Sequence, residues 1–381
     1  MKERITYIGL GSNLGDRENT IRRALELLSE AEHIEVTRVS DLIETAPLGQ
    51  LKQPKFINGV AEVKTTLSVE ELYEKLVEIE TLLGRKRQGK WTSRTIDLDL
   101  LLFGSDIVDL PHLIVPHPQM HLRSFVLKGL CQLNPDLLHP VIKEPAKELA
   151  ARLNGMDFML NPNQPQLISI AGIIGVGKTT LAKGLSEKLD CEVLLEPYDT
   201  NPFMPDVYAG KKELALDSQL YFLTHRISQL NRNVLQSGEV AISDYVFNKE
   251  QIYAKRLLNT LQLDLYEKIY KPISAEVTQP TLVVFLQDSA KSCLEHIHER
   301  GRSYEQRIDL HFLEALRNDY EQLFAEWKIC PIIRIKMSEF DCRRDSDIEH
   351  LANQVKCYIK SVKIRDESGS CRNNTIGSKA R

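Results

Sequence analysis

Two aspartates separated by a single residue lie in the segment Arg94-Thr-Ile-Asp-Leu-Asp-Leu-Leu-Leu-Phe103. Residues i and i+2 of a β-strand share a face, so Asp97 and Asp99 would point the same way, ~7 Å apart. Two like charges on an otherwise apolar strand repel each other and resist desolvation. Mg²⁺ bound by these oxygens and by substrate phosphates would remove both problems. The pair alone fits equally well an edge strand with a solvated charged face.

Cations flank this strand in the sequence, before and after it: Arg85, Arg87, Lys90, Arg94, His117 and Arg123. Arginine forks bind phosphate oxygens, and magnesium neutralises the remaining charge of a polyphosphate. Each cation alone is typical of a solvated surface, and His117, between two prolines, could merely cap a turn. As an ordered set around two carboxylates, they favour a polyphosphate site.

Residues 1–160 resemble the 6-hydroxymethyl-7,8-dihydropterin pyrophosphokinase family of folate biosynthesis. The matching stretches, in the family's order, are Tyr7–Leu14, Thr45–Gly49, Gln53–Asn58, Glu80–Arg85, Trp91–Asp99 and Val115–His117. The resemblance implies a ferredoxin-like α+β fold, ATP as co-substrate and a pair of magnesium ions. It implies transfer of a diphosphate from ATP to the pterin hydroxymethyl group, with release of AMP.

The same resemblance implies roles for individual residues. Asp97 and Asp99 would hold the magnesium ions, and Trp91 would lie on a mobile loop that closes over the substrates. The phosphates would meet Arg85, Arg94, His117 and Arg123, with Glu80 in the same cluster. The pterin slot would be lined by Thr45, Pro47, Leu48, Phe56, Asn58 and Phe125. A flat heteroaromatic ring suits aromatic faces and one amide, although Phe56 and Phe125 alone would be assigned to a core.

A second phosphate-binding pattern is Gly172-Ile-Ile-Gly-Val-Gly-Lys-Thr-Thr180, which follows an expected strand and opens an expected helix. Gly172, Gly175 and Gly177 would let backbone N–H groups wrap the phosphates of ATP, together with Thr180. Lys178 would neutralise the outer phosphates, and Thr179 would offer its hydroxyl to magnesium. In this context the pattern is specific for a phosphate loop.

Residues from about 166 to 360 resemble the deoxynucleoside kinase family in the order of their motifs. By that resemblance Glu196 would act as base toward a sugar 5′-hydroxyl, Gln219 would read the nucleobase, and Asp244 would sit at the metal. Tyr208 and Glu305 would meet the 3′-hydroxyl. A lid over ATP would be formed by Arg300, Arg302 and Arg307. The arginines also fit helix ion pairs, and Tyr208 and Gln219 fit a helix surface.

One departure from that family concerns the residue after Asp244, where arginine is usual and Tyr245 stands. Tyrosine cannot replace a guanidinium at a phosphoryl group in flight. Either another arginine substitutes, or the second unit is slow, altered in substrate, or a nucleotide-sensing or assembly module without turnover. An RNA-binding platform for the first unit is disfavoured, because the charge is negative and paired aromatic strand motifs are lacking.

Two further patterns are rejected. The glycines of Gly9-Leu-Gly-Ser-Asn-Leu-Gly15 suggest a dinucleotide-binding turn, but the third glycine is one position late. His296 and His298 suggest a metal pair, but residues two apart on a helix point away from each other.

The spacing of apolar residues predicts the elements that position these groups. In the first unit, strands are expected over residues 5–10, 34–43, 56–65 and 95–103, and helices from Asp16 and Ser68. This predicts a small α+β sandwich, with helices on one side of a mixed or antiparallel sheet. In the second unit, strands at 167–171, 192–195, 239–244, 281–286 and 331–336 alternate with helices. This predicts an α/β fold with a parallel sheet and helices on both faces.

Length and composition set the frame. The 381 residues suit more than one domain, and we expect domains over 1–160 and 167–365, a linker at 161–166 and a disordered tail at 366–381. The formal net charge of −4 gives no overall attraction for nucleic acid. No apolar run is long enough for a signal peptide or a membrane helix, and seven scattered cysteines suit neither disulfides nor zinc. We therefore expect a cytosolic protein, and a homodimer through the second domain is left open.

Overall fold

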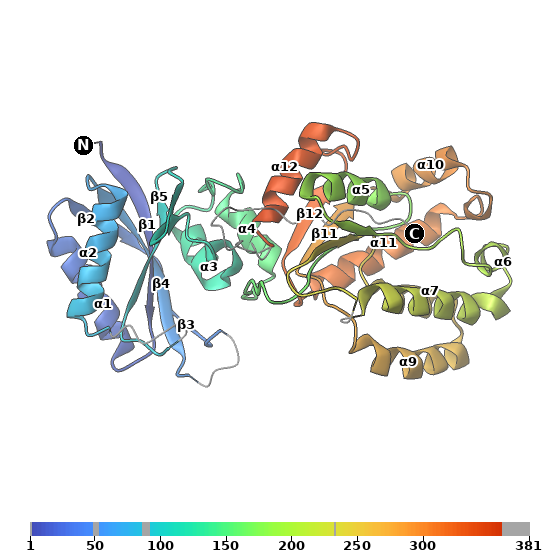
Figure 1. Cartoon of the computed structure of the whole chain (residues 1–381), viewed down its shortest axis with the longest axis horizontal. Helices are drawn as coiled ribbons and strands as arrows, with labels where there is room; N and C mark the ends of the chain where they lie inside the picture. Colours follow the sequence, from blue (N-terminus) through green and yellow to red (C-terminus); the bar gives the residue numbers. More distant parts are fainter. Residues whose placement is uncertain (1, 49–52, 86–91, 232–233, 360–381) are drawn as a thin grey trace, which may run out of the picture. The chain divides into compact units, whose positions relative to one another are not determined.

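The computed structural model describes residues 2–48, 53–85, 92–231 and 234–359. The chain forms two compact units, Met1–Met159 and Leu160–Arg381, and each has its own sheet (Figure 1). In the described part of the chain, no helix combines the length and apolar character needed to cross a membrane. The described cysteines are all free thiols.

The sheet of the first unit is antiparallel throughout, in the order β2-β4-β1-β5, with β3 paired to β4. Its strands are β1 (Arg4–Ser12), β2 (Ile34–Val39), β3 (Ile43–Thr45), β4 (Phe56–Thr65) and β5 (Asp97–Phe103). A separate hairpin consists of β6 (Val108–Leu110) and β7 (Leu113–Val115). Strands β1, β4 and β5 follow the predicted ranges closely, whereas the single strand expected over residues 34–43 is divided into β2 and the start of β3.

Two helices cover one face of this sheet. In α1 (Arg17–Glu30), the side chain of Asp16 caps the helix by accepting the Asn19 N–H, and α2 (Val69–Leu82) begins with a capping box between Ser68 and Glu71. Their apolar stripes join alternate strand residues in one core. The opposite face of β1 and β5 therefore carries the glycines and aspartates identified in the sequence.

The expectation of helices on one side only is wrong in one respect. Helix α3 (Ser124–Leu133) packs on the other face of β4, and α4 (Ala146–Leu153) packs on α3; a short 3-10 turn, η1 (Met120–Leu122), precedes them. Gly129 permits this contact, because a Cβ there would lie 2.6 Å from Cγ2 of Val60. The helix covers only part of that face.

The second unit has a parallel sheet in the order β12-β11-β8-β10-β9, as predicted. Its strands are β8 (Gln166–Ala171), β9 (Glu192–Leu194), β10 (Val240–Ser243), β11 (Leu282–Gln287) and β12 (Ile332–Lys336). Strand β8 is buried along its whole length, as expected for a central strand covered on both faces.

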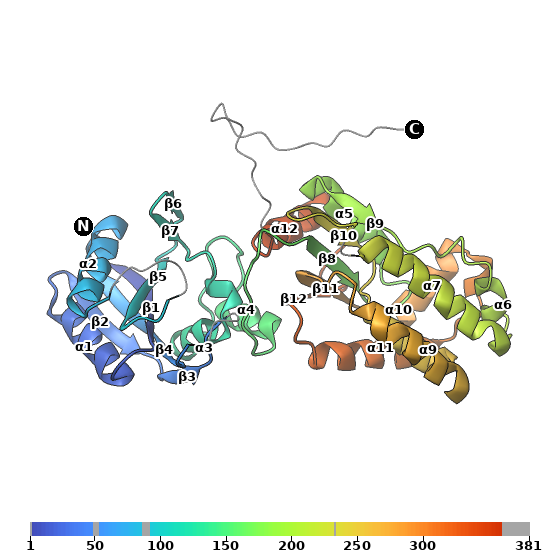
Figure 2. The same ribbon diagram turned by 60° about the horizontal axis from the view of Figure 1, so that its bottom comes forward.

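Helices lie on both faces of this sheet, with α5 and α12 on one side and α7, α9 and α11 on the other (Figures 1 and 2). The helices are α5 (Lys178–Leu189), α6 (Met204–Tyr208), α7 (Ala215–Leu230), α8 (Lys249–Leu257), α9 (Thr260–Ser274), α10 (Ala290–Arg300), α11 (Leu310–Ala325) and α12 (Asp345–Lys356). Short 3-10 turns are η2 (Lys212–Leu214) and η3 (Ser303–Glu305). The phosphate-loop motif joins β8 to α5, and the other motif residues lie at the same end of the sheet.

Candidate active sites

Glycines of β1 form the floor of the first candidate site. Gly9 pairs with Asp99 and Gly11 with Asp97 across the β1–β5 ladder. A Cβ on Gly11 would come within 3.0 Å of Oδ1 of Asn58, and one on Gly9 would come within 3.5 Å of Cβ of Asp99. Asp97 and Asp99 project from the same face, and the missing side chains keep the sheet surface beside them open.

Three of the predicted arginines pair with these carboxylates. Arg85 and Arg94 each approach Asp97 to 2.7 Å, and Arg123 lies 3.4 Å from Asp99. The Asp97 side chain is 17% exposed and the Asp99 side chain 31%. The structure therefore brings this part of the predicted cluster together at a partly open surface. Arg87 and Lys90 lie outside the described residues.

The two carboxylates have pKa values displaced in opposite directions. Burial, then repulsion from Asp99, raises the pKa of Asp97 to about 6, against the pull of Arg94 and Arg85. Burial also acts upward on Asp99, but His117 and Arg123 outweigh it and hold the pKa of Asp99 below its ordinary value. Asp99 is therefore the firm anion of the pair, and Asp97 is the carboxyl that depends on a nearby positive charge.

Glu80 and His117 interact electrostatically with the aspartate pair. Glu80 bonds to Arg85 and accepts the Leu98 N–H at 2.7 Å, which ties α2 to β5. Burial raises the pKa of Glu80 to about 7. The ring of His117 accepts the Gln119 N–H through Nδ1 at 3.3 Å, so the neutral ring carries its proton on Nε2. Burial lowers the pKa of His117, while the charge of Asp99 acts upward on it.

Only some of the residues expected to line a pterin slot contact one another in the structure. The Asn58 amide donates to Oγ1 of Thr45 at 2.7 Å, and Phe56 pairs with Thr45 across β3 and β4. Phe125 is half-buried at the start of α3. Pro47 and Leu48 are half-buried beyond β3, and Trp91 lies outside the described residues.

Sequence reasoning assigned no role to Asn13, which joins two loops around this site. Its side chain is buried, accepts the Arg94 N–H at 2.7 Å, and donates to Gln53 and the Pro54 carbonyl at 3.3 Å. Asn13 thereby fixes the backbone from which Arg94 reaches Asp97. The available signal was an amide just after a glycine-rich strand end, a place where a buried side chain often bonds to backbone.

The donor set of the first site fits magnesium. Hard cations prefer oxygen ligands, and Mg²⁺ is usually bound by one or two carboxylates plus substrate phosphates. Asp97 and Asp99 supply two such groups on one face. Within the described ranges, no group of three or more His, Cys, Asp or Glu could complete a metal cage. The remaining ligands would therefore have to come from a nucleotide and water.

The second candidate site is built on the backbone of the phosphate loop. Gly172, Gly175 and Gly177 have φ angles of 143°, 86° and 99°. A Cβ on Gly175 would lie 2.4 Å from the Cys293 carbonyl oxygen, so glycine is required there. Lys178 and Thr179 open α5 behind the loop, and Oγ1 of Thr179 donates to Asp244 at 2.6 Å.

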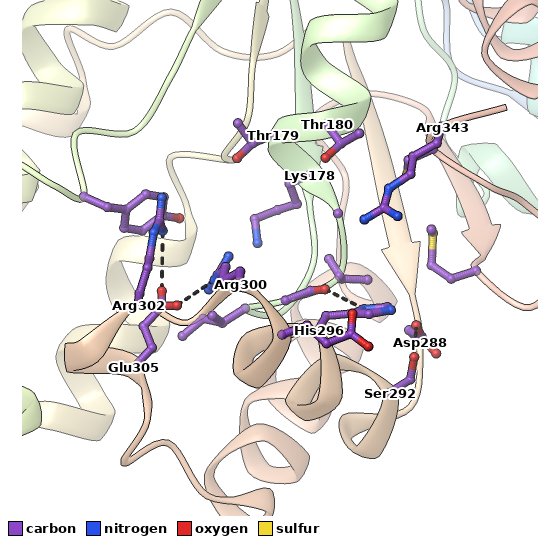
Figure 3. A pocket seen from close by; sticks show the side chains of 18 of the residues that line it. Lys178, Thr179, Thr180, Asp288, Ser292, His296, Arg300, Arg302, Glu305 and Arg343 are labelled. Carbon is purple, nitrogen blue, oxygen red and sulfur yellow. Dashed lines mark hydrogen bonds and ion pairs between the residues drawn. The ribbon is translucent and has the colours of Figure 1, made fainter. Parts of the chain in front are cut away.

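A cavity of about 910 Å³ lies over this loop (Figure 3). Lys178, Thr179, Thr180, Arg300 and Arg302 line it. Figure 3 shows Lys178 pointing into the space between the loop and Arg300, where its ammonium donates to the Ile173 carbonyl at 2.8 Å.

The predicted lid residues occupy two positions. Arg300 lies 2.6 Å from Glu305 and Arg302 lies 3.5 Å from it (Figure 3). Both line the larger cavity, as does Glu305. Arg307 instead lines a second cavity and donates to the Ala209 carbonyl at 2.9 Å.

That second cavity, of about 240 Å³, adjoins the first through shared lining residues that include Tyr198 and Tyr208. Gln219 of α7 lines it, and its buried Oε1 has no hydrogen-bond partner. An unpaired buried acceptor is costly, so this amide oxygen is available to a ligand. The cavity thus unites the predicted Tyr208 and Gln219.

Glu196 lies in a buried ion cluster and lines neither cavity. Arg226 and Lys249 both pair with it, and Arg226 also pairs with Glu250. Burial acts upward on the Glu196 carboxyl, but Arg226 and Lys249 outweigh it and lower its pKa to about 2. The backbone N–H of Glu196 donates to Asp244 at 2.9 Å.

Arg226, Lys249 and Glu250 were not identified from the sequence. Arg226 follows Gln219 by seven residues, so both lie on the same face of α7. A charged residue on that largely apolar stripe was the available signal. Lys249 at the start of α8 gave none, because lysine there is ordinarily a solvated residue.

Taken together, a glycine-rich loop between a parallel strand and a helix defines the second unit as a P-loop nucleotide-binding fold. The first unit carries a separate carboxylate–arginine site on an antiparallel sheet. Residues 7–135 match the family of 7,8-dihydro-6-hydroxymethylpterin-pyrophosphokinase (HPPK), and residues 168–360 match the deoxynucleoside kinase family.

Curated relatives match each part separately. The 2-amino-4-hydroxy-6-hydroxymethyldihydropteridine pyrophosphokinase of Bacillus subtilis is 46% identical over 129 residues, which are 34% of this chain and 77% of that protein. The deoxyguanosine kinase of Bacillus subtilis is 33% identical over 205 residues, 52% of this chain and 99% of that protein. The chain therefore belongs to both families, with a pterin pyrophosphokinase part followed by a deoxynucleoside kinase part.

A solved structure of deoxyadenosine kinase from M. mycoides, with the products dCMP and dCDP bound, is 26% identical. It covers 50% of this chain and 98% of its own, with a TM-score of 0.43.

Proposed function

We propose that the first unit transfers a diphosphate group from ATP to the hydroxymethyl group of 6-hydroxymethyl-7,8-dihydropterin. The hydroxyl oxygen of the pterin attacks the β-phosphorus of ATP, the bond from that phosphorus to the α,β-bridging oxygen breaks, AMP leaves, and the hydroxyl proton is released to water. The observation that carries this proposal is the placement of Asp97 and Asp99 on one open face among Arg85, Arg94 and Arg123.

Asp97 and Asp99 would hold magnesium, which when bound neutralises phosphate charge and orients the β-phosphorus. The arginines that now pair with the carboxylates would turn to phosphate oxygens, for which bidentate guanidinium groups are suited. His117 would donate Nε2–H to the same phosphates. We assign Glu80 to hold Arg85 rather than to touch substrate, since it is tied to α2 and β5.

For the pterin, we propose a slot beside Asn58. Its amide can donate and accept along the edge of a pterin ring, while Phe56 and Phe125 would provide aromatic faces. Thr45, Pro47 and Leu48 would form the rim, and Trp91 would close over the substrates. Apart from the short β3, which lies off the main strand order, the elements follow the order β-α-β-β-α-β, and this order with an antiparallel sheet supports a ferredoxin-like fold for the unit.

In the second unit, we propose phosphorylation of the 5′-hydroxyl of a deoxynucleoside by ATP. The bond between the γ-phosphorus and the β,γ-bridging oxygen breaks as the 5′-oxygen bonds to that phosphorus. The hydroxyl proton passes to the carboxylate of Glu196, and ADP leaves. Support comes from the junction of the phosphate-loop cavity with a smaller cavity lined by Gln219 and Tyr208.

Thr179 and Asp244 would hold magnesium, which supplies charge neutralisation at the outer phosphates. Arg300 and Arg302 would cover the phosphates from the other side, and Tyr208 with Glu305 would bind the sugar 3′-hydroxyl. Because a curated relative that is covered almost completely and is 33% identical is a deoxyguanosine kinase, deoxyguanosine is the first nucleoside we assign. The unpaired Oε1 of Gln219 can accept the N1–H of a guanine.

The alternative for this unit is a nucleotide-binding module without turnover, suggested by Tyr245. The paired cavities favour the kinase, because a module that only binds ATP has no need of a second cavity ending in an unpaired amide.

The test uses the full chain with ATP and magnesium. Reduced hydroxymethylpterin should yield AMP, and a panel of the four deoxynucleosides should yield ADP, with the highest rate for deoxyguanosine. Absence of AMP would refute the assignment of the first unit. Absence of ADP with every nucleoside would favour the binding module.

A further inference from the structure

Lys249 is the first residue of α8, and its ammonium group is buried inside the second unit. The side chain is 3% exposed, and Nζ donates to Oε2 of Glu196 at 2.6 Å. Three aromatic rings surround Nζ, with centroids at 5.8 Å for Tyr198, 5.7 Å for Tyr245 and 5.6 Å for Tyr253. Because aromatic faces attract a cation at about 6 Å, the ammonium is held in one place by an anion and three rings.

Lys249 contributes one of the two positive charges of a buried ion cluster. Lys249 and Arg226 balance the charges of Glu196 and Glu250, but desolvation offsets most of the attraction within a buried ion cluster. Replacing Lys249 alone by an apolar residue would leave the buried carboxylates of Glu196 and Glu250 to Arg226, so the charge of Lys249 matters to Glu196 in particular. The position of this charge relative to the two cavities is the second feature of Lys249.

Lys249 lies where the two cavities of the second unit meet. It lines the smaller cavity, and Tyr198, which its ammonium faces, lines both. Burial lowers the pKa of Lys249 to about 8, and the nearby charges of Arg226 and Lys178 act in the same direction. Lys249 therefore faces the same interior as the phosphate-loop lysine.

The residue after Asp244 cannot supply a cation at this place. Tyr245 is fully buried, and its hydroxyl donates to Oε1 of Gln229 at 2.7 Å. The ring of Tyr245 faces the ammonium of Lys249. A positive charge thus reaches the region from the start of α8, four residues further along the chain.

We propose that Lys249 is a positioning residue for phosphoryl transfer: from the lining of the smaller cavity, it holds the buried Glu196 carboxylate in one orientation. Lys249 makes and breaks no covalent bond in this step. The inference rests on the proposed kinase function of the second unit, because it assigns the charge that orients the acceptor of the 5′-hydroxyl proton.

The test compares Lys249→Met, Lys249→Arg, Glu196→Gln and the double variant Glu196→Gln/Lys249→Met in the full chain. The substrates are ATP and the deoxynucleoside that the unmodified protein uses best. Lys249→Met should lower kcat about 100-fold, a typical contribution of a positioned proton acceptor, with KM for the nucleoside changed less than about threefold. Lys249→Arg should recover kcat to within about tenfold of the unmodified chain.

The double variant measures whether Lys249 acts through Glu196. If it does, adding Lys249→Met to Glu196→Gln should change kcat by less than about threefold, because coupled residues are not additive. Lys255→Met, an exposed lysine on the same helix, is the matched control and should leave kcat unchanged. AMP formation by the first unit and thermal unfolding of each variant report on the integrity of the chain.

Three results would overturn the inference: kcat of Lys249→Met close to the unmodified value, a change in KM alone, or a full loss repeated in the Glu196→Gln background. If Lys249→Met does not fold, Lys249→Arg decides. A folded arginine variant with most of its activity supports the inference, and one that has lost about 100-fold in kcat contradicts it. An unmodified chain inactive with every deoxynucleoside would refute the proposed kinase function itself.

Discussion

In the first unit, the charges that would meet a nucleotide are side chains on a strand; in the second, they are mainly backbone amides of a glycine loop. Asp97 and Asp99 remain partly exposed and pair with arginines that can turn elsewhere. The glycines of the phosphate loop instead fit against neighbouring backbone, such as the Cys293 carbonyl. Two ways of binding phosphate thus occur in one chain.

The two sites differ in how the charge of their carboxylates is compensated. In the first unit, the repulsion between two carboxylates stays at the surface, where a metal and phosphates could relieve it. In the second unit, the corresponding carboxylate, Glu196, is compensated in advance by buried Arg226 and Lys249. Removing charge should therefore have consequences that differ between the units, and each can be measured separately because one releases AMP and the other ADP.

The largest expected effect is that of Asp97→Asn on the first activity. Loss of one of the two carboxylates on the strand should lower AMP formation about 10³-fold, the upper range for removing a single preorganised electrostatic group. ADP formation by the second unit should stay unchanged. Rates of AMP and ADP release from the same preparation provide the measurement.

Asp109→Asn is the matched control, since Asp109 is an exposed aspartate of β6. If Asp97→Asn formed AMP at the rate of this control, the first site would need no paired carboxylates. The contrast between the two phosphate-binding sites would then not hold.

Lys178→Met should produce the reverse pattern. The ammonium of Lys178 lines the cavity over the phosphate loop, and its loss should lower ADP formation about 100-fold through lost stabilisation of the outer phosphates. AMP formation should be unaffected. Lys183→Met, on the exposed face of α5, should change neither product. Equal loss of both products would indicate that the two units do not act separately.

The sequence predicted those parts of both sites that depend on residues close together in the chain. Alternation placed Asp97 and Asp99 on one face, and the loop before α5 identified Lys178 and Thr179, because both patterns are set by residues close in the chain. The parallel and antiparallel sheets followed from the same periodicity.

Long-range packing accounts for what the sequence did not show. Gly129 brings α3 onto the second face of the first sheet through a contact with Val60, which no local pattern encodes. The cluster of Glu196, Arg226 and Lys249 joins the loop after β9 to α7 and α8, which are distant from it in sequence. A lysine at the start of a helix ordinarily meets water, so its burial depends on elements that fold around it.

A smaller effect should follow from Asn13→Ala, which tests whether the first site depends on its loops. Without the acceptor for the Arg94 N–H, the arginine should lose its fixed position, and kcat/KM for AMP formation should fall about tenfold, because modest misplacement weakens transition-state contacts. Steady-state kinetics with both substrates varied gives the value. Asn134→Ala, an asparagine that ends α3, serves as the control; an equal loss there would point to general destabilisation.

The smallest expected effect is on stability, and it should have opposite signs in the two units. The pKa of Asp97 is raised from 3.8 to about 6, so this carboxyl holds its proton more often in the folded unit than in the unfolded chain between about pH 4 and 6. The contribution of Asp97 to stability should therefore decrease as pH rises through that window. The pKa of Glu196 is lowered from 4.5 to about 2. Its contribution is present above pH 4.5 and is lost as pH falls toward 2.

Hydrogen exchange of β1 and β8 can follow the two units in one sample. Asp97→Asn should flatten the pH dependence of protection in β1 between about pH 4 and 6. Glu196→Gln should reduce protection in β8 at neutral pH, and the difference from the unmodified chain should narrow below pH 4.5. The same slope in both strands would mean that the exposed carboxylate and the buried one are compensated alike, and the contrast between the two sites would then not hold.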